Sequence, residues 1–197
     1  MSGAFAIIAV VGVAGTALAV AGHYLAVGAR RARAGAPAAR GGLWSRLVYA
    51  ATALSFLVLA VTGFTPAVVW QTRLGGYWLM VHTVFGAVFG VCLTLLVLTW
   101  AGERRVGAAA RAAFWLVATL GLGSLMTMML GTVPWFGQEG MAVLFELHRW
   151  TGVVLTMAMI VHGYLRVLAR RAAPPARVSA GGRSAAAEAS GQSRAVS

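Results

Sequence analysis

The chain has 197 residues, of which 60% are apolar and only 10% are charged, and its formal net charge is +12. A soluble domain carries about a quarter charged residues, so this composition excludes an ordinary soluble globular protein. The basic residues are all Arg and lie in short clusters between apolar runs, which is typical of membrane topology and excludes nucleic-acid binding. The single cysteine, Cys92, excludes an internal disulfide and a CxxC motif.

Five apolar runs are long enough to cross a bilayer as helices. They are residues 3–28, 47–70, 77–100, 112–130 and 141–168. The first run has no positive residues before its apolar core, so we expect an uncleaved helix rather than a signal peptide. A four-span chain whose first run is removed stays as the alternative. Within the second run, Pro66 is expected to loosen the end of the helix.

The predicted fold is therefore an all-α, up-and-down bundle of five transmembrane helices over residues 1–171. Residues 172–197 are rich in Ala, Ser, Gly, Pro and Arg, which predicts a disordered cytoplasmic tail. Three Arg clusters follow the first, third and fifth runs and contain 14 of the 16 Arg. The positive-inside rule then places the N-terminus outside and the C-terminus in the cytoplasm.

The chain has four histidines, and all of them fall inside predicted spans. An ionisable residue inside a membrane is costly and is usually functional, although a single one can serve as polar packing between helices. From their places in the spans, His82 and His148 are predicted near the outer face, and His23 and His162 near the inner face. His148 and His162 are 14 residues apart on one helix face and separated by about 21 Å of rise, which suits two stacked cofactors rather than one metal ion.

A haem held between two helices needs one imidazole from each. We therefore predict that His82 and His148 bind an outer haem iron, and that His23 and His162 bind an inner one. A structural role for the histidines, without haem, stays as an alternative.

Three further residues are candidate haem contacts. Gly86 and Gly152 each follow a histidine by four residues and share its helix face, where a missing side chain leaves room for a flat macrocycle. The alternative for these glycines is close helix packing. Arg149 can bind haem propionates through its planar guanidinium; the alternatives are an interfacial Arg or a partner for Glu146.

Three segments resemble the di-haem cytochrome b subunits of membrane-bound formate dehydrogenases and nickel–iron hydrogenases. The stretch His82-Thr-Val-Phe-Gly resembles that family's second core helix. The stretch from His148-Arg149-Trp150-Thr151-Gly152 to Val161-His162-Gly163-Tyr164 resembles its last helix, and Arg46-Leu47-Val48-Tyr49 with the run to Gly63-Phe64 resembles its first. The resemblance covers roughly residues 46–170.

The resemblance implies a multi-pass protein of the bacterial inner membrane. It also implies two haem b groups, a quinone, and a redox partner subunit that carries iron–sulfur clusters or is itself a cytochrome. The family usually has a His where this chain has Tyr49. One hypothesis is that His23 replaces the missing ligand. The rival is that the inner haem is absent or five-coordinate, which gives a mono-haem cytochrome b.

The expected function is electron transfer across the bilayer through two bis-His haems, between a partner subunit and the quinone pool, as a subunit rather than an enzyme alone. The loop with Gly102, Glu103, Arg104 and Arg105 is a candidate lip for the quinone site, or an ordinary positive-inside loop. A haem-free structural or assembly subunit is the second class. A transporter is the third, and the lack of a convincing internal repeat disfavours it.

Overall fold

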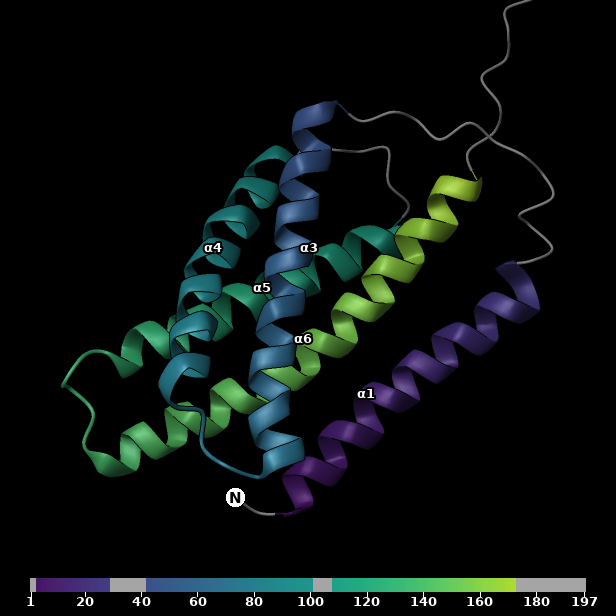
Figure 1. The fold of residues 1–197 in the computed structure, drawn as a ribbon. Coiled ribbons are helices and arrows are strands. Elements are labelled where there is room, and N and C mark those ends of the chain that lie inside the picture. The colour runs from purple at the N-terminus through teal and green to yellow at the C-terminus, as the bar shows by residue number, and fades with distance from the viewer. Residues whose placement is uncertain (1–2, 29–41, 101–107, 173–197) are drawn as a thin grey trace, which may run out of the picture.

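The computed structural model describes residues 3–28, 42–100 and 108–172, and no strand occurs in these ranges. Five helical rods make up the fold (Figure 1): α1 (Gly3–His23) with η1 (Tyr24–Gly28), α3 (Leu43–Phe64) with η3 (Thr65–Trp70), α4 (Gly76–Trp100), α5 (Ala108–Gly131) and α6 (Gln138–Ala172). All five are long and apolar enough to cross a membrane. The predicted all-helical fold with five membrane-spanning helices is thus confirmed, and its apolar surface indicates contact with lipid.

Four helices begin earlier than the predicted spans, and two of them also end later. α3 begins at Leu43 rather than at residue 47, and α4 begins at Gly76 rather than at residue 77. α5 runs from Ala108 to Gly131 rather than over 112–130, and α6 runs from Gln138 to Ala172 rather than over 141–168. A helix satisfies its own backbone hydrogen bonds, so it can continue past the apolar core of a bilayer while long Arg side chains reach water. The predicted tail lies outside the described residues except for Ala172, which ends α6. The 101–107 loop, including the candidate quinone lip, also lies outside them.

Pro66 changes the end of the second span, as expected. From Thr65 to Trp70 the helix widens into a π-helical turn, because Pro66 has no N–H to donate. The N–H of Gln71 then bonds to the carbonyl of Pro66, and Gln71 adopts a left-handed conformation with φ 51°. This cap ends the rod and leads into the short turn before α4.

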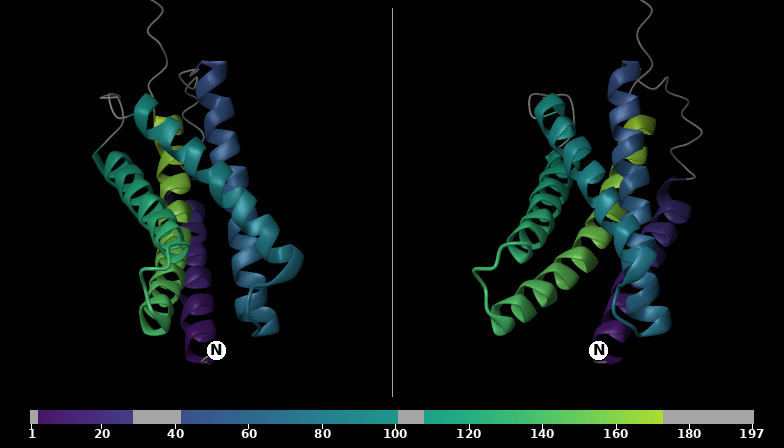
Figure 2. Two further views of the ribbon diagram at one scale, coloured as in Figure 1. Left: turned by 90° about the vertical axis from the view of Figure 1, so that its left-hand side faces the viewer. Right: turned by 60° about the vertical axis from the view of Figure 1, so that its left-hand side comes forward.

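The helices form two hairpins with an added N-terminal rod. α3 packs along α4 and α5 along α6, whereas contacts between the hairpins are fewer and come mainly from α4 with α5. α1 lies against α6 and touches η3. Figure 2 shows the hairpins diverging toward the end that carries their turns, residues 71–75 and 132–137, which we call the turn end.

Apolar clusters fill the bundle centre and its opposite end. The central cluster joins the hairpins through Phe89, Leu93, Val117, Leu155 and Ala158. A second cluster, of Val48, Leu96 and Phe114, lies toward the opposite end from the turns. In the central cluster, the close approach of α4 and α5 needs a small residue: a Cβ added at Gly121 would lie 2.6 Å from Leu93 Cδ2.

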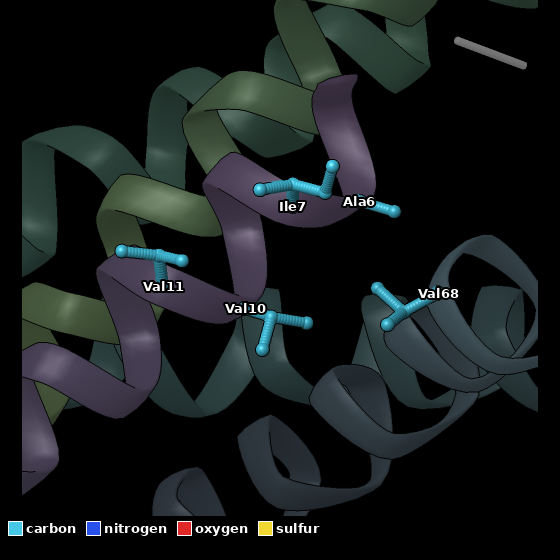
Figure 3. A pocket seen from close by; sticks show the side chains of 5 residues that line it. All are labelled: Ala6, Ile7, Val10, Val11 and Val68. Atoms are coloured by element: carbon cyan, nitrogen blue, oxygen red, sulfur yellow. The ribbon is translucent and has the colours of Figure 1, made fainter. Parts of the chain in front are cut away.

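The N-terminal rod packs less completely than the hairpins. Its buried residues, Phe5 and Ala9, form a small cluster with Val153 of α6. Beside it, Ala6, Ile7, Val10 and Val11 of α1 and Val68 of η3 line a shallow groove of about 270 Å³ (Figure 3). All five side chains are aliphatic, so this groove offers no polar chemistry and suits lipid contact.

Candidate functional site

His82 of α4 and His148 of α6 come together between the two hairpins, near the turn end. Their ring centres lie 6.3 Å apart, and their ring planes cross at 83°. The two rings meet although α4 and α6 make few close backbone approaches. The pair that the sequence assigns to one depth is therefore brought together by the fold.

His82 is held by the preceding helix of its own hairpin. Its Nδ1 lies 2.9 Å from Thr62 Oγ1, and that hydroxyl lies 2.7 Å from the Val58 carbonyl oxygen. The hydroxyl has one proton, which the carbonyl accepts, so its oxygen accepts a hydrogen bond from Nδ1–H. Gly63 lets the ring sit against α3, because a Cβ there would lie 3.3 Å from His82 Cε1. The lone pair of His82 is consequently on Nε2.

His148 is held in the same way by α5. Its Nδ1 lies 3.2 Å from the backbone carbonyl oxygen of Ser124, 3.1 Å from Ser124 Oγ and 3.2 Å from Thr127 Oγ1. A carbonyl oxygen can only accept, so Nδ1 carries the proton. The Thr127 hydroxyl donates to the same carbonyl at 2.7 Å. The lone pair of His148 is therefore also on Nε2.

This arrangement fits a metal held between two imidazoles. Two imidazoles bonded at about 2.0 Å on opposite sides of one metal ion have ring centres about 6 Å apart, close to the 6.3 Å found here. Metal-binding histidines almost always donate their second nitrogen to a fixed acceptor, and both rings do so. Among the described residues no group of three or more His, Cys, Asp or Glu could hold a metal ion. Two imidazoles alone could hold a metal whose remaining ligands come from a non-protein group.

The two predicted glycines differ in the space beside them. A Cβ added at Gly152 would meet nothing within 4 Å, whereas one at Gly86 would touch Leu59 Cδ2 at 4.0 Å. Gly152 lies one turn after His148 on the same helix face, and the position of its absent Cβ is open. Gly86 lies in ordinary packing contact with α3.

Arg149 forms an ion pair with Glu146, which was one of the predicted alternatives to a haem contact. Two of its other N–H groups remain available to an anion. Its Nη1 donates to Glu146, and its guanidinium carbon lies 3.9 Å from the centre of the Phe5 ring. Its Nε and Nη2 are buried and have no hydrogen-bond partner within the described ranges. Two free donors of a guanidinium suit a carboxylate, and here they lie on the side of α6 that faces Phe5 of α1.

The structure does not bring His23 and His162 together. His23 is exposed on α1 and hydrogen-bonds the hydroxyl of Tyr164. His162 is buried on α6, with its ring centre 6.1 Å from that of Phe114. A haem between these two histidines stays a prediction, and their contacts do not favour it.

Thr62, Ser124 and Thr127 were not singled out from the sequence. Hydroxyls inside apolar spans usually bond back to their own helix, and several others here do so, which makes such residues uninformative alone. A usable signal is depth: Thr62 is near the end of its span and Ser124 and Thr127 near the end of theirs, at the same turn end as the two histidines.

Comparison with protein-family models, with curated proteins and with solved structures gave no significant match.

Proposed function

We propose that this chain is a membrane-embedded b-type cytochrome subunit that binds haem between His82 and His148. The observation that supports it is the pair itself: two imidazoles from two hairpins, 6.3 Å apart, each with Nδ1 engaged and Nε2 left for a metal. The resemblance of residues 46–170 to di-haem cytochrome b subunits points to the same chemistry.

Each neighbouring residue has a definite task in this site. Thr62 and the Ser124 carbonyl fix the ring orientations and tautomers, and Arg149 offers Nε and Nη2 to a propionate. Gly152 leaves room beside His148. Haem, when bound, supplies one-electron transfer at a potential set by its ligands and its burial.

The proposed role is electron transfer between a redox partner subunit and a quinone, in a complex, rather than catalysis by this chain alone. An electron carrier needs a donor and an acceptor, and the resemblance implies these two. The Arg distribution supports an N-terminus outside and a C-terminus in the cytoplasm, and the resemblance supports the bacterial inner membrane.

A second candidate is a haem-free structural subunit. It is favoured by the fact that each histidine bonds a hydroxyl within its own hairpin, His82 to Thr62 and His148 to Ser124. Hydrogen bonds of this kind also join membrane helices without any cofactor. The two candidates differ in one observable, the colour of the purified protein.

The test is the dithionite-reduced minus oxidised absorption spectrum of the protein purified in detergent. We expect the α and Soret bands of a b-type haem in the wild type, and their loss in His82→Ala and His148→Ala. Thr156→Val is the matched control, because Thr156 is buried on α6 and its hydroxyl donates back to the Gly152 carbonyl of the same helix. A colourless wild type, or bands that survive both histidine changes, would overturn the proposal.

A further inference from the structure

We infer that the chain binds haem only at the His82–His148 level, and that Arg166 closes the opposite end of the bundle by inserting between Tyr49 and Trp100. This inference rests on the proposed function. It concerns the second haem that a di-haem cytochrome would carry. The residues around His162 and His23 do not fit such a group.

His162 differs from His82 and His148 because its Nδ1 is not held by a hydrogen-bond partner among the described residues. His162 is only 4% exposed, and its Nδ1 has no hydrogen-bond partner in the described part of the chain. A metal-binding His almost always has that second nitrogen fixed by an acceptor. His162 instead packs against the Phe114 ring, which belongs to the apolar cluster with Val48 and Leu96.

His23 does not supply the missing partner. It bonds Tyr164, and positions 162 and 164 point about 200° apart around a helix. Because Tyr164 faces α1 while His162 faces Phe114 of α5, a single haem cannot lie between His23 and His162 without a rearrangement of α6 and α1. His23 is exposed, and the open groove of about 450 Å³ between α1 and α6 at this level is lined by Tyr24 and Tyr164 but not by His162.

Arg166 occupies the space one turn beyond His162. Its guanidinium carbon lies 3.8 Å from the centre of the Tyr49 ring and 3.8 Å from that of Trp100. The Tyr49 and Trp100 rings are nearly parallel, at 16°, with centres 6.4 Å apart. The cation therefore joins α6 to Tyr49 of α3 and Trp100 of α4 and occupies the space one turn from His162.

The consequence is a cytochrome with one haem and a closed opposite end. The packed apolar side chains of the central cluster, among them Phe89, Leu93 and Leu155, lie between the His82–His148 pair and the Arg166 side chain. Electrons then enter and leave through the half of the bundle that holds the turn end. Both the donor and the acceptor must approach that half.

The test is the number of haems per chain, by pyridine haemochrome, in the wild type, His162→Leu, His162→Ala and His82→Ala. We expect one haem in the wild type, an unchanged count and α band in the His162 variants, and none in His82→Ala. His162→Leu keeps most of the buried volume, so it remains informative if His162→Ala does not fold.

Two haems in the wild type, with loss of one in His162→Leu, would overturn the single-haem inference and leave the proposed function standing. A wild type without haem would overturn the proposed function itself. The two failures are therefore distinct.

Discussion

At the scale of single residues, the tautomers of the two histidines carry the chemistry. A ring whose Nδ1 donates to a fixed oxygen presents the lone pair of Nε2, and the nearby oxygens of Thr62 and Ser124 impose this state on both rings. The histidines and their pairing by depth are readable from the sequence. The supporting hydroxyls are not, because Thr and Ser are common in membrane helices and their partners lie on another helix.

Thr62→Val should weaken haem binding while leaving both ligands in place. The change keeps the side-chain shape and removes the hydroxyl that His82 Nδ1 hydrogen-bonds, so we expect about a 10- to 100-fold loss of haem affinity, on the order found for such supporting residues. Haem titration of the apoprotein measures it. Thr52→Val is the control, because Thr52 is equally buried on α3 and bonds back to Val48. Equal affinities for the two variants would contradict the role of Thr62.

Ser124→Ala should have a smaller effect than Thr62→Val. His148 Nδ1 keeps the Ser124 backbone carbonyl and the Thr127 hydroxyl as acceptors, so the tautomer is preserved. We expect less than a 10-fold loss in the same titration. A loss as large as that of Thr62→Val would show that the hydroxyl rather than the carbonyl fixes the ring.

Gly152→Leu should prevent haem binding by filling the open space beside His148. Gly163→Leu is the control on the same helix, since a Cβ at either glycine meets nothing within 4 Å, and Gly163 lies away from the histidine pair. Haem content after purification, with helix content by circular dichroism, separates blocked binding from misfolding. Full haem content in Gly152→Leu would contradict a macrocycle beside this glycine.

At the scale of elements, the sequence locates the spans, and the structure corrects their ends. The predicted runs 47–70 and 141–168 are bounded by Arg46 and Arg170, but the helices continue past both residues, because hydrogen bonding within a helix does not depend on hydropathy. The pairing of α3 with α4 and α5 with α6 follows from short turns. The divergence of the two hairpins could not be predicted, since it depends on which side chains meet across them.

Gly121→Ala should destabilise the contact between α4 and α5. A Cβ there would lie 2.6 Å from Leu93 Cδ2 and 3.3 Å from Phe89 Cε1 in a packed core, and such overpacking costs about 1–3 kcal/mol. Thermal unfolding in detergent measures it. Gly123→Ala is the control two residues away, where a Cβ meets nothing within 4 Å. A Gly121 variant as stable as the Gly123 variant would contradict the close approach.

At the scale of the whole molecule, the proposed haem site lies at the turn end of the bundle, where the two hairpins diverge. Five spans place the described start of α1 and the end of α6 at opposite ends of the bundle (Figure 1). The Arg clusters of the sequence predict which of these ends faces the cytoplasm.

A single cysteine introduced at either terminus tests the orientation. With Cys92 replaced by Ala, we expect Ser2→Cys to react with a membrane-impermeant maleimide in intact spheroplasts. Ser197→Cys should react only after the membrane is opened, because the positive-inside rule predicts that the C-terminal side lies in the cytoplasm. The reverse pattern would contradict the assigned topology and with it the side from which redox partners approach.

Haem binding by the His82–His148 pair is tested first by a pyridine haemochrome assay on the purified 197-residue chain, with haem counted per polypeptide. We expect one b-type haem, bound between His82 and His148. A protein without haem would contradict this expectation and bring forward a structural role for the two histidines.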